Sequence, residues 1–167
     1  MTRNPLDIVR TFQVELPVDV EGAILALGIE LDRSAALPPG ISGELRKLPT
    51  GRFVIKASAR EHLFRRRFTM AHELGHFIFH RDIVGDGVDD DQLYRSTTEG
   101  DIYNSRIKRI HEAQANSFAA NFLMPKDLMR KELRKVGPVV DALYPRFQVS
   151  PSAMRWRLST MDVEEPV

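Results

Sequence analysis

The sequence predicts an α+β protein that is mostly helical, with a small β-sheet and a helical segment at its C-terminal end. Two stretches, residues 41–48 and 52–57, have the character of strands and flank a turn-forming trio at residues 49–51. Helical patterns account for most of the remaining chain, and it contains no internal repeat or low-complexity stretch. With 167 residues the chain is long enough to bury a core as one domain. We expect a single domain over the whole chain, in which residues 126–167 pack on a core formed by about residues 18–125.

The elements around the predicted strands follow from short local patterns. Residues 19–27 have the pattern of a short amphipathic helix, which Gly28 ends. A brief extended segment follows at residues 29–31, and residues 34–40, which include two prolines, are expected to form a loop. After the strands, the chain is apolar nearly all round between about residues 64 and 80, which predicts a buried helix.

The second half of the chain is predicted to be a polar connection followed by helices. The connection covers residues 81–101, and its aspartates do not fit the calcium-loop pattern, so we expect a solvated loop bordering a cleft. Helices are predicted at residues 102–123, at residues 126–136 (a basic amphipathic one) and twice within residues 138–161. Pro125 and Gly137 mark helix boundaries, and Ser150 caps the last helix with Pro151 at its first position.

The composition excludes several kinds of site and partner. The chain has no cysteine, so any metal must be held by His, Asp or Glu, and neither disulfides nor thiol nucleophiles are possible. It has 24 Lys and Arg against 23 Asp and Glu, a balance that gives no sign of a nucleic-acid or membrane surface. No apolar run approaches the length of a membrane span, and the N-terminus lacks the apolar stretch of a signal peptide. We therefore expect a cytoplasmic protein that binds neither membranes nor, directly, nucleic acids.

The most informative motif is His-Glu-Leu-Gly-His at residues 72–76. On a helix, His72 and His76 share one face and can bind one metal ion. Glu73 lies about 100° around the helix, where it can act as a base toward water on that metal. A surface helix with two solvated histidines is the alternative, but the apolar flanks argue against it, because buried polar side chains need partners. The motif therefore predicts a metal site, with Zn²⁺ as the metal that this pattern typically binds.

A third ligand is expected, because a catalytic zinc usually has three protein ligands and an open position for water. Glu112 is the candidate, since the alanines around it and Gly75 on the other helix would let two helices approach closely. A carboxylate on such a face is costly unless it is paired or bound to a metal. Asn116 lies one turn further along, where its amide oxygen could accept a hydrogen bond from a ligand histidine. Spacing alone leaves open that Glu112 is instead a surface carboxylate that pairs with Lys108.

Two segments carry a resemblance to a known family. They are RFTMAHELGH at residues 67–76 and EAQANSFAANFLMP at residues 112–125, and they resemble the two signature blocks of the ImmA/IrrE family of metallopeptidases, in the same order. The similarity extends from about residue 18 to residue 158, including the start of the first predicted strand and the segment that leads into the last helix.

The resemblance implies a zincin-like metallopeptidase domain in which His72, His76 and Glu112 hold zinc and Glu73 is the catalytic acid and base. It also implies that Glu112, and not a nearby acid such as Glu99, is the third ligand. Members of this family typically act in bacteria, their mobile elements or phages. Several of them cleave a helix-turn-helix repressor or antitoxin and so release transcription.

Other polar residues near the motif have more than one interpretation. His80 follows the motif by one turn, and a fourth protein ligand would leave no open position on the metal. We therefore expect His80 to support a ligand from outside the metal shell, or to lie at the end of the helix, where the helix dipole favours it. His62 and His111 are expected on the surface or in packing contacts. Tyr94 or Tyr103 could donate to a developing oxyanion, although packing is the simpler role for both.

These observations favour a zinc-dependent endopeptidase that cleaves a helix-turn-helix repressor or antitoxin and thereby regulates transcription. One alternative is a zinc-containing toxin or regulatory protein that mainly sequesters its partner. The other is a DNA-binding regulator that uses the short helix of residues 149–158 with the basic stretches at residues 65–67 and 126–135. The competing interpretation of the same residues is a helix that packs on the protein core, with the neighbouring arginines forming a solvated rim.

Overall fold

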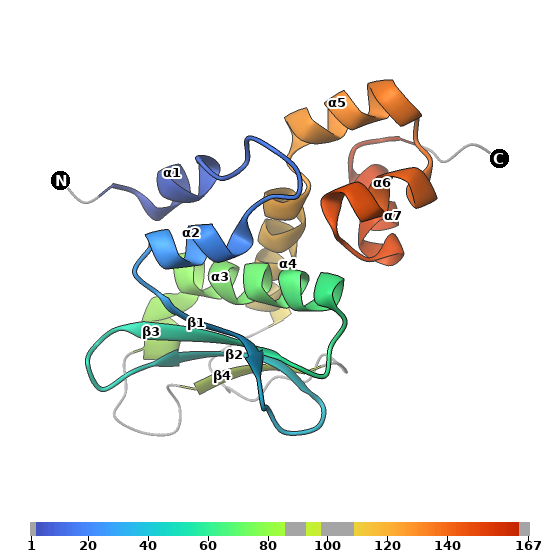
Figure 1. The fold of residues 1–167 in the computed structure, drawn as a ribbon. Coiled ribbons are helices and arrows are strands. Elements are labelled where there is room, and N and C mark those ends of the chain that lie inside the picture. Colours follow the sequence, from blue (N-terminus) through green and yellow to red (C-terminus); the bar gives the residue numbers. More distant parts are fainter. Residues whose placement is uncertain (1–2, 86–92, 98–108, 164–167) are drawn as a thin grey trace.

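The computed structural model describes residues 3–85 and 109–163, together with the backbone of residues 93–97. The elements in chain order are α1 (Pro5–Arg10), α2 (Val20–Ala26), β1 (Glu30–Ala35), β2 (Ile41–Lys47), β3 (Phe53–Ser58), α3 (Leu63–Gly85), β4 (Leu93–Thr97), α4 (Arg109–Leu123), α5 (Lys126–Val136), α6 (Val140–Phe147) and α7 (Pro151–Thr160). The strands form one sheet in the order β1-β3-β2-β4, in which β1 is parallel to β3 and β2 is antiparallel to both of its neighbours. In Figure 1 the described helices lie on one side of this sheet. The predicted α+β class, mostly helical with a small sheet, is confirmed.

The two middle strands of the sheet, β3 and β2, pack against α3. Side chains alternate between the two faces of a strand, so Leu45 of β2 and Ile55 of β3, which are register partners, both point into the core and are fully buried. Gly43 of β2 faces the same side. A Cβ atom at this position would overlap the Thr69 methyl group and lie 3.1 Å from Glu73 Oε1. The missing side chain therefore lets the motif turn of α3 lie directly against β2.

Small residues bring α3 and α4 into close contact, as the sequence predicts. A Cβ atom at Gly75 would lie 3.0 Å from Phe118 Cδ1 and 3.2 Å from the Ala115 Cα atom. Ala115 is fully buried at this contact, and Ala119 and Ala120 of α4 are buried in the core. This approach of two backbones positions the first turn of α4, with Glu112, beside the motif.

The C-terminal helices share the core of the rest of the protein. Met154 and Leu158 of α7 are buried in the same apolar cluster as the buried residues of α3 and α4. Arg157, also buried, donates from Nε to the Met124 carbonyl oxygen at 3.0 Å, just after α4 ends. The predicted cap is present, since Ser150 Oγ accepts from the Ala153 amide at 3.1 Å. One face of α7 is thus packed against the rest of the protein, as the packing interpretation of residues 149–158 expects.

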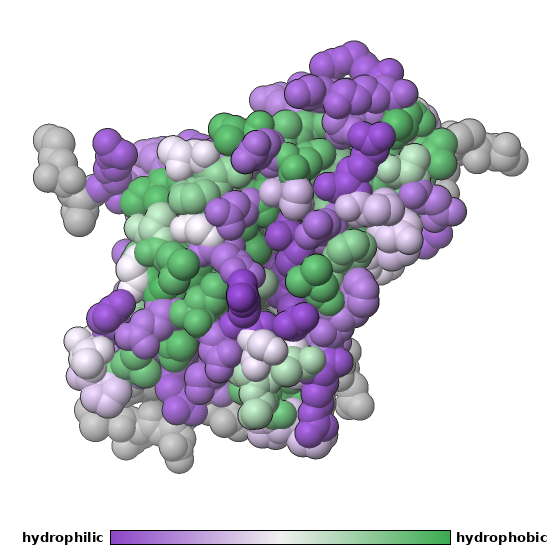
Figure 2. Space-filling model, in the orientation of Figure 1, coloured by the Kyte–Doolittle hydropathy of each residue, from purple (hydrophilic) through white to green (hydrophobic). Residues whose placement is uncertain are grey.

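The basic stretches have different environments. Figure 2 shows a hydrophilic surface where α5 lies, at the top of the view, which agrees with the predicted basic amphipathic helix. The expected solvated rim at residues 65–67 is wrong in part. Arg65 is exposed, but Arg67 is buried and donates to the Val18 carbonyl oxygen at 2.7 Å, so it links α3 to the segment before α2.

Several predicted boundaries are wrong. α3 continues to Gly85, because Ile83 and the fully buried Val84 extend its apolar face beyond residue 80. The expected connection at residues 81–101 contains β4, which adds to the sheet beside β2. β1 reaches Ala35, so the expected loop at residues 34–40 is shorter.

The start of the chain contains a helix that the sequence patterns did not predict. In α1, Asn4 Oδ1 accepts from the Leu6 amide at 3.0 Å and Pro5 occupies the first turn. The aspartate-rich residues 86–91 and the predicted helical residues 102–108 lie outside the described part of the chain. Among the described helices, none combines the length and apolar character that crossing a membrane requires.

Candidate metal centre

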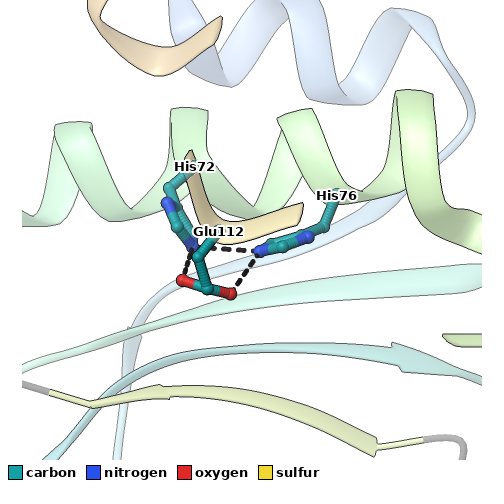
Figure 3. Close-up of side chains that lie close together, drawn as sticks. All are labelled: His72, His76 and Glu112. Carbon is teal, nitrogen blue, oxygen red and sulfur yellow. Dashed lines mark hydrogen bonds and ion pairs between the residues drawn. The ribbon is translucent and has the colours of Figure 1, made fainter. Parts of the chain in front are cut away.

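Two histidines of α3 and one glutamate of α4 converge on one point. In Figure 3, His72 and His76 point toward Glu112, whose two carboxylate oxygens face the two rings. The Nε2 atoms of the histidines are 3.1 Å apart. Glu112 Oε2 lies 3.3 Å from His72 Nε2, and Glu112 Oε1 lies 2.9 Å from His76 Nε2. The structure thus brings together the three side chains that the sequence predicts as ligands.

This donor set fits a zinc ion. A zinc ion binds imidazole nitrogen at about 2.0–2.1 Å, so two nitrogens on one tetrahedral ion lie roughly 3.3 Å apart. The separations of 2.9 to 3.3 Å among the three groups are close to that value. Two histidines and one carboxylate also form a ligand set that leaves a fourth position open. Within the described residues, no other trio of His, Asp or Glu side chains gathers in this way.

Asn116 fixes the orientation of the His72 ring. Its Oδ1 atom lies 2.8 Å from His72 Nδ1. An amide oxygen only accepts, so Nδ1 carries a proton, and in the neutral ring the lone pair is on Nε2. Asn116 is one turn after Glu112 on α4, where the sequence analysis placed it. One turn of α4 therefore faces both nitrogens of His72, with Glu112 at Nε2 and Asn116 at Nδ1.

His76 is oriented by a chain of hydrogen bonds that ends on α4. His80 Nε2 lies 2.7 Å from Gln114 Oε1, so His80 donates from Nε2, and its Nδ1 is left as an acceptor. His76 Nδ1 lies 2.9 Å from His80 Nδ1 and therefore donates to it. Burial lowers the pKa of His80, which keeps that acceptor available. These hydrogen bonds leave the lone pair of His76 on Nε2, toward Glu112.

This series of hydrogen bonds changes the interpretation of His80. The expected helix-end position is wrong, because α3 runs on to Gly85, whereas the contact with a predicted ligand is present. Gln114 did not stand out in the sequence. The available signal was its place between Glu112 and Asn116, which puts it on the part of α4 that faces α3.

Burial and neighbouring charges move the pKa values of the two predicted histidine ligands in opposite directions. Burial lowers the pKa of His76 to about 4, and the rings of His72 and His80 add to this effect against the opposing contact with Glu112. Burial also acts to lower the pKa of His72, but the hydrogen bond to Glu112 and the charges of Glu73 and Glu112 outweigh it, so that pKa is raised. His76 is thus neutral near pH 7, with an Nε2 lone pair to offer to a cation.

Glu73 lies beside this cluster and faces the sheet. It follows His72 on α3, is fully buried, and directs Oε1 toward Gly43 of β2. A carboxylate next to a group of ligands can accept and return a proton within the same small volume. The motif predicts that Glu73 is the acid and base, and this role stays a prediction.

The remaining predicted residues are only partly described. His62 is exposed, and its Nδ1 accepts from the Phe64 amide at 3.2 Å at the start of α3. The His111 ring packs 4.7 Å from that of His80, centroid to centroid. Of Tyr94 only the backbone in β4 is described. Three further residues named above lie outside the described ranges: Glu99, Tyr103 and Lys108.

Residues 38–159 match the model of the peptidase family described as the IrrE N-terminal-like domain. The chain belongs to this family. All three residues of the candidate metal centre and Glu73 lie inside the matched range, so the IrrE-like assignment covers the whole site.

Two known proteins are similar to this IrrE-like chain. The radiation response metalloprotease IrrE of Deinococcus radiodurans is 34% identical over 109 residues, which are 64% of this chain and 30% of that protein. The solved structure of a Mycobacterium tuberculosis transcriptional regulator superposes with a TM-score of 0.61 at 23% identity, over 93% of this chain and 46% of the regulator, and shares the fold. The chain therefore spans less than half the length of either protein.

Proposed function

We propose that this chain is a zinc-dependent endopeptidase in which His72, His76 and Glu112 hold the metal and Glu73 is the general base. The convergence of two Nε2 atoms and a carboxylate from two closely packed helices carries this proposal. Membership in a metallopeptidase family and the 34% identity to a metalloprotease support it.

Each residue of the site has a distinct part in the proposed hydrolysis. Bound zinc would supply a Lewis acid that polarises a carbonyl group and lowers the pKa of water toward about 7. Glu73 takes up the proton of the attacking water on its carboxylate and delivers it to the leaving amine. Gly43 keeps space beside Glu73 Oε1, because a side chain there would press on the carboxylate. Asn116 and His80 hold the two histidine rings with their Nε2 lone pairs toward the metal.

The substrate that we propose is a helix-turn-helix repressor or antitoxin, whose cleavage in the cytoplasm releases transcription. The support is the resemblance of residues 67–76 and 112–125 to the ImmA/IrrE blocks, since several members of that family act on such proteins. The near balance of basic and acidic residues and the packed state of α7 favour a protein substrate over nucleic acid.

The Glu73→Gln variant tests the catalytic assignment. We expect turnover to fall on the order of 100- to 10,000-fold, because the amide cannot accept the proton, while bound zinc stays near one per chain. Peptide cleavage and metal analysis on the same purified sample separate the two effects. A variant that keeps its zinc and cleaves at the wild-type rate would exclude Glu73 as the base.

Incubation with the repressor or antitoxin encoded beside this chain's gene tests the substrate. We expect cleavage that stops when a chelator removes the metal and returns when zinc is restored. A complex that forms without cleavage, with or without chelator, would favour the sequestration alternative.

A further inference from the structure

A cavity lies next to the candidate metal centre. It has a volume of about 520 Å³ and is enclosed by the N-terminal turns of α3, by α4 and by the start of α7. That volume falls within the range of roughly 300–1,000 Å³ that is usual for ligand sites in proteins. The lining is mixed: Phe64, Phe68 and Trp156 supply rings, while Asn116, Ser117 and Ser150 supply polar groups.

Three lining residues contact the candidate metal centre or lie close to it along α3 and α4. Asn116 lines the cavity and, at 2.8 Å, contacts His72. Phe68, also in the lining, precedes His72 by one turn of α3, and Ala113 directly follows Glu112 on α4. A polypeptide whose backbone crosses the metal centre would therefore meet this cavity within a few residues of the bond to be cleaved.

Two features of the lining indicate the chemistry of its occupant. Trp156 is 45% exposed, although its neighbours Met154 and Leu158 on α7 are buried, so a large apolar side chain is left open to water at the cavity wall. Arg65 is exposed at the cavity, and none of the residues that the structure describes forms an ion pair with it. The cavity thus combines apolar walls with one positive charge.

We propose that this cavity is a specificity site that receives an apolar side chain of the protein substrate close to the scissile bond, with Arg65 attracting an acidic residue next to it. The inference rests on the proposed peptidase function and adds to it the kind of sequence that the enzyme selects.

Trp156 provides a direct binding signal, because it is the one tryptophan in the chain. The protein is the full chain with Glu73→Gln, loaded with zinc, so that peptides bind without being cleaved. The probes are blocked pentapeptides of Ser and Gly with Leu, Phe, Ser or Lys at the centre. Burying an apolar side chain should make the Leu and Phe peptides bind about tenfold or more tightly than the Ser and Lys peptides, with a blue shift of Trp156 emission.

Cavity-filling variants on two walls show whether the preference for apolar peptides arises in the cavity. In Ala113→Leu on α4 and Ala153→Leu on α7, we expect the preference for Leu and Phe peptides to disappear. Ala26→Leu on α2, an exposed alanine outside the cavity, should keep it. Circular dichroism and thermal unfolding check that each variant is folded, and the second wall keeps the test decisive if one variant is not.

The proposed role of the Arg65 charge is tested with peptides that carry either Glu or Gln directly after the central Leu. Arg65→Gln should remove a preference for the Glu peptide, while Arg60→Gln, an exposed arginine outside the cavity, should leave it unchanged. Equal binding of all four central residues, or a preference that survives both cavity-filling changes, would overturn the proposal. Because fluorescence does not require cleavage, an active enzyme without this preference refutes only the specificity site. An inactive chain that shows the preference refutes only the hydrolysis.

Discussion

Two carboxylates, one on α4 and one on α5, are held in very different ways. Glu132 of α5 is 5% exposed and accepts from Lys135 Nζ and Arg146 Nη1, each at 2.7 Å. Glu112 of α4 instead faces two imidazole nitrogens, those of His72 and His76. The Glu132 cluster contains its own positive charges, and its pairing is completed by residues of α5 and α6.

The Glu112 cluster is built from groups that supply lone pairs. Burial lowers the pKa of His76 to about 4, so this ring brings no positive charge at neutral pH. The Nδ1 protons of the two rings are directed to Asn116 and His80, away from Glu112. In their neutral forms the two rings direct Nε2 lone pairs to the side of Glu112, an arrangement that suits a cation from outside the chain, whereas Glu132 already has two cationic partners. The comparison thus separates a candidate metal centre from a structural ion-pair cluster.

Removal of one ligand should have the largest effect on the metal centre. In His72→Ala, we expect zinc to fall from about one per chain to below detection, because two ligands from different helices bind weakly. Wild-type protein should be stabilised by about 4 kcal/mol at a zinc concentration 1,000 times its Kd, and the variant should show no such shift. Metal analysis and thermal unfolding with and without chelator measure both effects.

The matched control for this prediction is Glu132→Gln, which removes a buried carboxylate from the other cluster. It should keep a full equivalent of zinc. Stoichiometric zinc in His72→Ala, or zinc loss in Glu132→Gln, would contradict the division between the two clusters.

Loss of the hydrogen bond that orients His72 should weaken the metal centre without abolishing it. In Asn116→Ala we expect zinc affinity to fall about 10- to 100-fold, because the ring is no longer held with its Nε2 atom inward. Competition with a coloured chelator gives the affinity. Asn121→Ala is the control, since Asn121 is an exposed asparagine on the same helix that bonds Ser117 and not the cluster. Equal losses in both variants would point to α4 stability and not to ring orientation.

The spacing of α3 and α4 should matter for both stability and metal binding. In Gly75→Ala the added methyl meets Phe118 and the backbone of Ala115, so we expect destabilisation of about 1–3 kcal/mol and weaker zinc binding as Glu112 moves away. An alanine in an unobstructed helix position would instead add about 0.4–1 kcal/mol of stability. The sign of the change in the free energy of unfolding, measured with urea, therefore shows whether the added methyl group meets its neighbours or enters open space.

Much of the site could be predicted because its information is local. His72, Glu73 and His76 fall within five residues, and the helical repeat alone places both histidines on one face. The second block, with Glu112 and Asn116, lies on another helix, yet its small residues indicate close packing. The sequence patterns therefore predicted the two histidines and made Glu112 a candidate, the family resemblance selected Glu112 as the third group, and neither could give the distances between them.

The features that sequence patterns missed depend on contacts between distant segments. β4 has no strong strand pattern and is stabilised by pairing with β2, about 50 residues earlier in the chain. The acceptor of His80 is Gln114, 34 residues away on another helix. Arg67 looked like a surface charge, but it reaches the Val18 carbonyl oxygen across the fold. Single-segment periodicity carries no information on such pairings.

The smallest expected effect concerns the self-contained cluster and depends on pH. Hydrogen bonding to Lys135, together with Arg146, lowers the pKa of Glu132 below its ordinary value of 4.5, so the folded protein binds this proton more weakly than the unfolded chain. The carboxylate therefore adds stability above pH 4.5, and this contribution is lost as the pH falls through the lowered pKa. Because Lys135 and Arg146 are about half exposed and screened by water, Glu132→Gln should cost only about 1 kcal/mol at pH 7.

Urea unfolding of wild type and Glu132→Gln at pH 7, 5 and 3 measures this contribution as a difference between the two proteins. The difference should be constant from pH 7 to 5 and become smaller as the pH falls below 4.5 toward the lowered pKa, because the wild-type carboxyl group then takes up a proton and comes to resemble the amide. Asp127→Asn, on the exposed side of α5, should show no measurable difference at any of these pH values. Equal destabilisation by Glu132→Gln at pH 3 and at pH 7 would mean that side-chain packing and hydrogen bonding, and not charge pairing, connect α5 to α6. Charge pairing would then not distinguish this cluster from the candidate metal centre.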